Sequence, residues 1–267
     1  MKQLSFSLTI FLSALNSALA QHVQEAVAFP SLSSPAVQVS GKDWTLWLEL
    51  SPEAIEKKRA TIPRLCAPIR AMHWVGQPDA ELKFTPEPAE WVFTWTKSPG
   101  DGRTIQIVLD AEPILLADLP PVASAGDGSI LLPAHTATPH GEKLRYEPQW
   151  FKNTVGYWAV PTDYVTWSLH VDQPGTFSVA ILQGCGAGQG GSDAKLSMRS
   201  GDAGAVELPF QVLETGHFQN FRWNHLGKIR LEAAGDYELR IEAVKVAKNA
   251  LVDIRAVHLV RQANDAN

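Results

Sequence analysis

Apolar and polar residues alternate over several short stretches of this chain, mostly in its second half. In residues 164–171, YVTWSLHV, the apolar side chains Val165, Trp167, Leu169 and Val171 all fall on one face. Strict period-two alternation with one polar face is typical of antiparallel sheets, and several such strands joined by turns indicate a β-sandwich. The same pattern continues over residues 176–182, 194–198, 206–212 and 236–244.

The first half has a less regular pattern. Residues 43–50 predict a strand with Trp44, Leu46 and Leu48 on one face. Ser51 followed by Pro52 is typical of a helix start, because serine caps the free N–H groups and proline fits the first turn. A single short helix is therefore expected after residue 51.

Three more strands are expected before residue 111. They cover residues 80–84, 90–95 and 104–110. The last two are separated by a segment containing Pro99-Gly100-Asp101-Gly102, which favours a tight turn. We therefore predict that residues 90–95 and 104–110 form a hairpin.

The composition divides the chain in two. Residues 116–129 are rich in Pro, Ala and Gly and are typical of a linker. We predict a small β-rich domain with one short helix over residues 21–120, and a β-sandwich over 124–262. The fold class is all-β.

Residues 1–20 resemble a secretory signal: a basic start at Lys2, an apolar run, and Ala18-Leu19-Ala20 before the expected cleavage site. A retained anchor is the alternative, and no later segment is long and apolar enough to span a membrane. Without Lys2, 22 basic residues face 28 acidic ones, which does not favour nucleic acid as a partner. A secreted or periplasmic location is expected.

Residues 182–193, LQGCGAGQGGSD, contain the glycine spacing of a dinucleotide-binding turn. That chemistry needs a helix after the glycines, so that its N-terminus faces the phosphate. Residues 194–198 instead alternate as a strand. We therefore interpret the glycine run as a sharp connection between two strands.

The two cysteines, Cys66 and Cys185, form either a disulfide or two buried free thiols. A disulfide requires Cα atoms within about 7 Å of each other, which the sequence does not show. Cys66-x-Pro68-x-Arg70 resembles the formylglycine segment of sulfatases. The calcium-binding aspartate pair that this family places upstream has no counterpart, since only Asp43 precedes the motif. Glu147, Asp163 and Glu214 could pair as a glycosidase couple, but no motif marks them. The chain is not expected to be an enzyme.

The segments "VGYWAVPTDYVTWSLHV", "TGHFQNFRW" and "VDIRAVHLV" (beginning at residues 155, 215 and 252) resemble modules fused to bacterial sulfatases and fucosidases. More distantly, they are similar to carbohydrate-binding modules of families 6 and 35. The resemblance covers residues 129 to about 260. It implies a galactose-binding-like jelly roll that binds a polysaccharide or glycan through aromatic side chains on the loops at one end. Glycan-degrading enzymes would be possible partners.

The resemblance also implies a set of ligand-binding residues. Tyr157 falls where those modules place a ring beside the sugar, and Phe218 falls at the opposing ring. Aromatic rings bury the apolar face of a sugar while polar groups satisfy its hydroxyls. Ordinary core packing is the alternative for the aromatic members. The full set is Tyr157, Trp158, His217, Phe218, Asn220 and Asn249.

The structural calcium site of those modules has no clear counterpart. Their first strand carries acidic ligands, whereas residues 131–137, LLPAHTA, contain none. Asp253 matches the acidic residue of the last strand but makes a poor calcium site alone. No metal and no cofactor are expected. The alternatives to glycan binding are a structural or interaction module, or the remnant of a sulfatase- or fucosidase-type enzyme.

Overall fold

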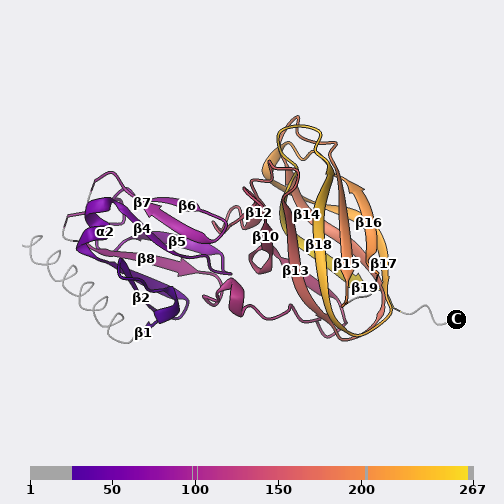
Figure 1. The fold of residues 1–267 in the computed structure, drawn as a ribbon, viewed down its shortest axis with the longest axis horizontal. Helices are drawn as coiled ribbons and strands as arrows, with labels where there is room; N and C mark the ends of the chain where they lie inside the picture. The colour runs from indigo at the N-terminus through magenta and orange to yellow at the C-terminus, as the bar shows by residue number, and fades with distance from the viewer. Residues whose placement is uncertain (1–25, 98, 101, 202–203, 264–267) are drawn as a thin grey trace, which may run out of the picture. The chain divides into compact units, whose positions relative to one another are not determined.

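The computed structural model describes residues 26–97, 99–100, 102–201 and 204–263 (Figure 1). The expected signal segment and its cleavage site lie outside these residues. The chain forms two compact units. The first contains most residues up to 112, and the second contains residues 113–267 together with the short segments 64–68 and 86–90. The boundary thus lies before the linker expected from the sequence.

The first unit contains two antiparallel sheets and one α-helix, which share a core of aromatic and aliphatic side chains. Trp74 of one sheet packs edge-on against Trp95, which follows a strand of the other, with ring centroids 5.1 Å apart. The larger sheet has the order β1 (Val27–Ala28), β2 (Val37–Lys42), β3 (Thr45–Leu50), β8 (Thr104–Leu109) and β5 (Ile69–Trp74), and the smaller has β4 (Arg59–Pro63), β7 (Glu90–Thr94) and β6 (Lys83–Pro86).

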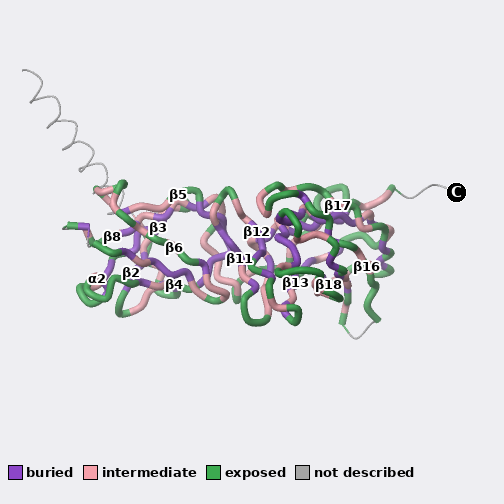
Figure 2. The backbone as a smooth tube through the Cα atoms, turned by 90° about the horizontal axis from the view of Figure 1, so that it is seen from above, coloured by how far each residue is buried: buried purple, intermediate pink, exposed green. Residues whose placement is uncertain are grey.

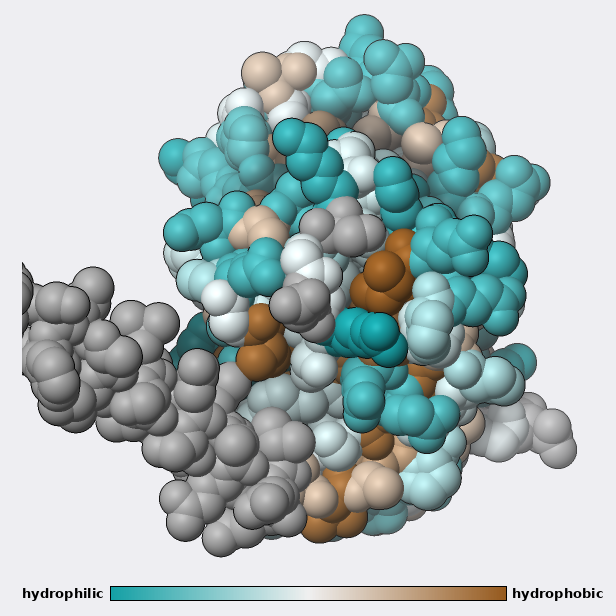
Figure 3. Space-filling model, turned by 90° about the vertical axis from the view of Figure 1, so that its left-hand side faces the viewer, coloured by the Kyte–Doolittle hydropathy of each residue, from teal (hydrophilic) through white to brown (hydrophobic). Residues whose placement is uncertain are grey.

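The predicted helix is present as α2 (Pro52–Lys57), and Ser51 caps it by accepting a hydrogen bond from Ala54 N at 3.2 Å. Trp44 corrects the predicted strand face: it lies in the β2–β3 turn with φ 61° and is exposed. On the face of this unit shown in Figure 3, side chains are largely hydrophilic and apolar ones appear in separate patches.

The predicted hairpin between residues 90–95 and 104–110 is wrong. Its turn forms, with Gly102 N donating to Pro99 O at 2.8 Å, but β7 pairs with β4 and β6 while β8 pairs with β3 and β5. The connection therefore crosses from one sheet to the other. Both strands carry buried apolar residues, which explains why the pattern alone did not identify their partners.

The second unit is a sandwich of two antiparallel sheets, which confirms the all-β prediction. We call them the β13 sheet and the β14 sheet. The β13 sheet has the order β10 (Thr138–His140), β13 (Tyr164–Val171), β18 (Gly235–Lys245), β15 (Asp193–Arg199) and β16 (Val206–Gln211). The β14 sheet has the order β11 (Arg145–Glu147), β12 (Thr154–Gly156), β19 (Asp253–Arg261), β14 (Gly175–Cys185) and β17 (His217–Leu231), with β9 (Ile130–Pro133) paired to β19.

The period-two pattern of these strands is the one that fills the core. Val165, Trp167 and Leu169 of β13 are fully buried, as are Phe177 and Ile181 of β14. In Figure 2, buried stretches alternate with half-buried and exposed ones along the strands. Each sheet therefore presents one face to the core and the other to solvent.

Residues 116–129 do not form a free linker. Three 3-10 turns occur in the described chain: η1 (Pro30–Leu32), η2 (Leu116–Asp118) and η3 (Ala134–Thr136). After η2, the chain runs along β13, where Val122 N donates to Ser168 O and Val122 O accepts from His170 N, both at 2.9 Å. The composition did not reveal this pairing, because the two hydrogen bonds join backbone groups, which every type of residue except proline can supply.

Candidate functional site

The glycine run forms the loop between β14 and β15, and a strand follows it, as predicted. Gly188 and Gly191 have φ of 73° and 87°, values that favour glycine. Gly188 N donates to the Glu214 carboxylate at 2.8 Å. The Glu214 carboxylate thus accepts from a glycine-loop N–H group that a nucleotide phosphate would otherwise bind.

Four loops meet at one end of the sandwich. Leu251 N donates to Trp158 O at 2.8 Å, which joins the loop after β12 to the loop before β19. Asn249 N donates to Gln189 Oε1 at 3.1 Å, which joins that loop to the glycine loop. Ala187 N then donates to Gly216 O at 3.2 Å. The segments that carry the predicted ligand-binding residues are therefore neighbours in the structure.

Tyr157 is exposed at this loop end, and its ring has a fixed support. The residue is 53% exposed and has φ 61°, a left-handed conformation that is uncommon for tyrosine. The Arg145 guanidinium carbon lies 3.8 Å from the ring centroid. Arg145 Nη1 in turn donates to Pro86 O at 2.9 Å and pairs with Glu87 at 3.0 Å. One face of the ring is therefore covered by a fixed cation, and the side chain still presents surface to solvent.

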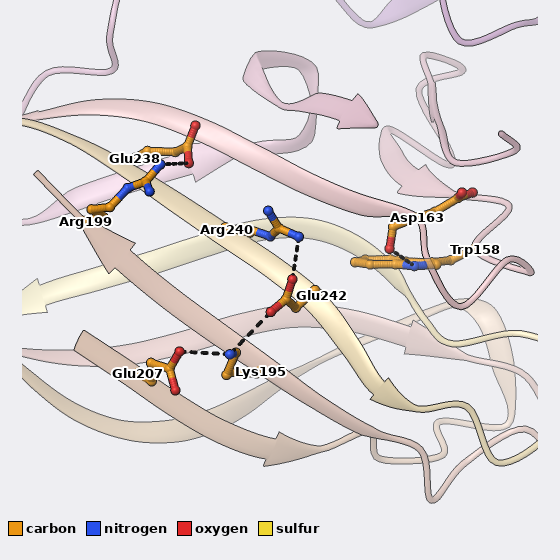
Figure 4. Close-up of polar contacts among 8 residues, drawn as sticks. All are labelled: Trp158, Asp163, Lys195, Arg199, Glu207, Glu238, Arg240 and Glu242. Atoms are coloured by element: carbon orange, nitrogen blue, oxygen red, sulfur yellow. Dashed lines mark hydrogen bonds and ion pairs between the residues drawn. The ribbon is translucent and has the colours of Figure 1, made fainter. Parts of the chain in front are cut away.

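Trp158 does not belong to the loop surface. It is only 1% exposed and packs in the sandwich core, and its Nε1 donates to the backbone oxygen of Asp163 at 3.0 Å (Figure 4). The β12 strand ends at Gly156, and the turn at Tyr157 sends the two neighbouring aromatic rings in different directions. The core alternative holds for this residue, which corrects its place in the predicted set.

Phe218 is half-buried against the glycine loop. A Cβ atom built on Gly186 would come within 2.7 Å of Phe218 Cε2, so the ring lies directly on the Gly186 backbone. His217 and Asn220 are exposed and also shape this segment: His217 Nδ1 accepts from Gln219 N at 3.1 Å, and Asn220 Nδ2 donates to Thr215 O at 2.5 Å. Asn249 is also exposed, and its backbone N–H donates the hydrogen bond to Gln189 Oε1.

Two buried carboxyl groups lie behind the Tyr157 turn. A Cβ atom on Gly156 would meet Asp253 Oδ1 at 2.7 Å and Glu147 Oε2 at 2.8 Å, so both groups flank this glycine. Burial raises the pKa of Asp253 well above its usual value, and the charge of Glu147 adds to the increase. Lys152, which pairs with Glu147, acts in the opposite direction. Asp253 therefore tends to retain its proton.

The other catalytic candidates have structural surroundings. Cys66 and Cys185 are both buried free thiols, and burial raises the pKa of each, that of Cys185 to about 11. Arg70 pairs with Asp110 at 2.5 Å. Asp163 accepts hydrogen bonds from the backbone N–H groups of residues 142–144 at 2.8–3.0 Å. These arrangements stabilise loops and keep both thiols protonated, which opposes nucleophilic chemistry at either cysteine.

Several surface residues were not identified from the sequence. Arg145, beneath Tyr157, lies in a three-residue strand that shows no periodicity. Trp150 and Phe151 are exposed in the β11–β12 loop, with ring centroids 5.8 Å apart. Trp223, on the outer face of the β14 sheet, is 43% exposed and lies 6.0 Å from the His258 ring. Of these, only the Trp150-Phe151 pair has a signal in the sequence, namely two adjacent aromatics in a loop.

Among the described residues, no group of three or more His, Cys, Asp or Glu side chains could hold a metal ion. The helices in this part of the chain are also too short or too polar to cross a bilayer.

No family model matches the sequence, and no curated protein matches it either. Among solved structures, the chain is similar to an α-L-fucosidase from Vibrio sp. strain EJY3, with 12% identity and a TM-score of 0.35 over 91% of this chain and 43% of that one. The chain thus spans less than half of the fucosidase.

Two carbohydrate-binding modules are similar to about half of the chain. The C-terminal family 6 module of a marine laminarinase from Zobellia galactanivorans has 14% identity and a TM-score of 0.40, over 50% of this chain and 99% of the module. A family 35 module from Cellvibrio japonicus has 13% identity and a TM-score of 0.38, over 51% and 94%. These are the module families that the sequence resembles.

Proposed function

We propose that the second unit binds a glycan at the loop end of its sandwich, with Tyr157 as the main contact. The observation that carries this proposal is the exposed Tyr157 ring, held in a left-handed backbone conformation and supported on one face by Arg145. Unusual backbone geometry of this kind costs free energy and recurs at binding and active sites as well as in turns such as that at Trp44. A ring fixed in this way loses little freedom when a sugar packs on it.

The surrounding groups suit the hydroxyl rim of a sugar. His217, Asn220 and Asn249 are exposed: the first two lie at the start of β17, and Asn249 lies in the loop before β19. Imidazole and amide groups can both donate and accept hydrogen bonds, as hydroxyl groups require. Phe218 offers a second, half-buried ring at the glycine loop. The ligand is a polysaccharide or oligosaccharide, and the role is binding rather than turnover.

The proposed setting is outside the cytoplasm, in agreement with the signal-like residues 1–20, where glycan-degrading enzymes would be the natural partners. A cell fractionation experiment with the full chain tests this part separately. Recovery of the intact protein from the cytoplasm would contradict it and would leave the binding site itself untouched.

The test of binding is a glycan array followed by calorimetric titration of the full chain. We expect weak, saturable binding that Tyr157→Ala reduces about fivefold or more, because an aromatic contact of this kind contributes about 1 kcal/mol or more. Tyr164→Ala is the matched control. Tyr164 also has an arginine over its ring, Arg240 at 3.7 Å, but His140 stacks on it at 4.4 Å, so both ring faces are covered.

Two results would overturn the proposal. One is the absence of binding to any glycan on the array. The other is binding that Trp223→Ala removes and Tyr157→Ala leaves intact, which would move the site to the outer face of the β14 sheet. The second outcome has a physical basis, since Trp223 is an exposed aromatic residue there, beside the His258 ring.

A further inference from the structure

Apolar side chains also gather on the outer face of the β14 sheet, outside the proposed glycan site. Strand pairing places Leu182 of β14 between Trp223 of β17 and Ala256 of β19. On β14 and β19 these positions point away from the core, because the adjacent residues Ile181 and Val257 are fully buried in it. The outer face of this sheet is therefore apolar at its centre.

Ring and guanidinium contacts join these side chains into one surface. The Trp223 ring lies 6.0 Å from the ring of His258, which is two strands away, so the two rings meet over β14. Two residues before Trp223, the Phe221 ring lies 3.8 Å from the guanidinium carbon of Arg255. Arg255 Nη2 in turn donates to Phe151 O at 2.7 Å, which fixes the β11–β12 loop beside the sheet. The apolar face, as we call this surface, consists of Leu131, Phe151, Leu182, Phe221, Trp223 and Val260.

Much of the apolar face is in contact with water. Leu131, Phe151, Trp223 and Val260 are all exposed, and Trp150 beside Phe151 is 64% exposed. Single exposed apolar residues are common on soluble proteins, whereas contiguous ones mark interaction surfaces. Tryptophan and arginine contribute most often to the energy of protein–protein binding, and here Trp223 and Arg255 lie on the same surface. The apolar face therefore has the composition of a docking surface.

The charges on this side of the sheet are basic. Lys228 of β17 is exposed opposite Ser178, and within the described part of the chain neither Lys228 nor Arg255 forms an ion pair. His225 and His258 lie on either side of Ala180. A partner that covers these residues is favoured if it brings negative charge.

No carboxylate of the sheet itself supplies that negative charge. The strands of the β14 sheet contain two acidic residues, Glu147 and Asp253, and both are buried behind the Tyr157 turn. Glu232 follows the end of β17 and pairs with Arg230 at 2.8 Å. Positive charge on the apolar face is thus left for a partner to balance.

The side chains favour a polypeptide over a sugar as that partner. Leu131 and Val260 are aliphatic and offer no flat ring on which a sugar could stack. None of the exposed or half-buried residues of β9, β14 and β19 is Asp, Glu, Asn or Gln, the side chains that usually orient sugar hydroxyls. Apolar side chains of a polypeptide can fill the same surface without such groups.

A second copy of the chain fits less well. In a symmetric dimer the same surface of both copies meets, so Lys228 and Arg255 of one copy would approach those of the other. Like charges across an interface oppose association. The partner is therefore expected to be a different polypeptide.

We propose that the apolar face docks a partner polypeptide whose apolar side chains alternate with aspartate or glutamate. The apolar side chains would cover Trp223 and its neighbours, and the carboxylates would pair with Lys228 and Arg255. This inference goes beyond the proposed glycan binding and does not depend on it, because no residue of the apolar face belongs to the site around Tyr157.

The test is calorimetric titration of the full chain with a short synthetic peptide in which Asp alternates with Leu and Phe. One comparison peptide has Lys in place of every Asp, and another has Ser in place of every Leu and Phe. We expect the acidic apolar peptide to bind saturably and each comparison peptide to bind about tenfold more weakly or less, since one loses the charge match and the other the apolar contact. Its affinity should also fall as the salt concentration rises.

Two variants assign the binding to the apolar face. Trp223→Ala should weaken binding of the acidic apolar peptide about tenfold or more, and Lys228→Glu about fivefold. Both residues are exposed, so Lys228→Glu keeps the test valid if Trp223→Ala does not fold. The matched controls, Trp44→Ala and Lys245→Glu, change an exposed tryptophan and an exposed lysine elsewhere and should leave the affinity within about twofold.

The proposal is overturned if the acidic apolar peptide does not bind, if the Lys-containing peptide binds equally well, or if neither variant changes the affinity. A dimer that sedimentation detects and that Trp223→Ala dissociates would instead assign the apolar face to a second copy. A glycan whose binding Trp223→Ala removes would assign it to a sugar, and either result also overturns the proposal. Loss of glycan binding with Tyr157→Ala, by contrast, concerns only the loop end.

Discussion

The loop end of the sandwich and the outer face of the β13 sheet present their side chains in opposite ways. On the β13 sheet, Lys195 lies 2.8 Å from Glu207 and 3.3 Å from Glu242, which also pairs with Arg240 (Figure 4). At the loop end, by contrast, Tyr157 has a partner on one face only. Charges that satisfy one another form a solvated surface, whereas the exposed ring leaves apolar area in contact with water.

The two arginine-supported tyrosines make this difference concrete. Arg240 and His140 enclose Tyr164, and the backbone there is an ordinary strand. Arg145 supports Tyr157, whose backbone is left-handed and whose side chain is exposed. The same cation–ring contact thus occurs at an enclosed ring in one place and at an exposed ring in the other. In the proposed function, only the exposed ring is available to a ligand.

The largest expected effect is a loss of stability when Trp158, the core residue next to Tyr157, is replaced. Trp158→Ala should destabilise the second unit by about 3–5 kcal/mol, because it leaves a cavity in the core and removes the hydrogen bond to Asp163 O. Chemical denaturation of the full chain measures this. A loss of less than about 1 kcal/mol would show that Trp158 is not a core residue.

The pH dependence of stability tests the buried carboxyl pair behind Tyr157. The pKa of Asp253 is higher in the folded state than in the unfolded state, where it is near 3.8. The contribution of protonated Asp253 to stability is therefore complete below pH 3.8 and is lost as the pH rises through the pKa of the folded state. We expect the thermal midpoint of the second unit to decline with rising pH above about 4, and Asp253→Asn to flatten that decline. Glu147 and Lys152 are the neighbouring charges.

The matched control is Asp193→Asn, which changes an exposed aspartate. It should leave the pH profile of the wild-type protein unchanged. An Asp253→Asn protein whose midpoint declines as steeply as the wild type would contradict the assignment.

A smaller effect tests the strain at Tyr157. Tyr157→Gly and Tyr157→Ala both remove the ring, but only glycine adopts φ 61° without cost. The glycine variant should therefore be about 1 kcal/mol more stable than the alanine variant. Denaturation midpoints compare the two directly, and equal stabilities would remove backbone strain from the argument for function.

The smallest effect is expected on the charged face. Lys195→Ala should change stability by no more than about 0.5 kcal/mol, since its two carboxylate partners lie at a partly exposed surface. It should also leave glycan affinity unchanged. A large loss of affinity would place the binding site on the β13 sheet and reverse the contrast drawn above.

The sequence predicted the strands of the sandwich better than their connections or its site. Strand β13 has its predicted bounds, because buried and exposed positions alternate without interruption. Strand β17 was not predicted: register shifts interrupt its pairing with β14, at Val179/Ala180 and at Gln183/Cys185, and few of its side chains are buried. Alternation is clearest where one face is fully covered, as in β13, although β16 was also predicted from it and has no fully buried residue.

The site was predicted at the level of loops rather than side chains. The resemblance pointed to Tyr157, which follows β12, and to Phe218, which lies at the start of β17 against the glycine loop. It also included Trp158, which is buried in the core because the chain turns at Tyr157. Arg145 was not identified because its contact with Tyr157 depends on the pairing of β11 with β12. Contacts across paired strands leave no local pattern in the sequence.

The central claim is that a glycan lies on Tyr157. The chain has four tyrosines, so incorporation of fluorotyrosine gives four ¹⁹F signals that mutation can assign. On titration with a glycan that the chain binds, we predict that the Tyr157 signal shifts in proportion to saturation, while those of Tyr146, Tyr164 and Tyr237 stay in place. Saturable binding with an unmoved Tyr157 signal would contradict the account.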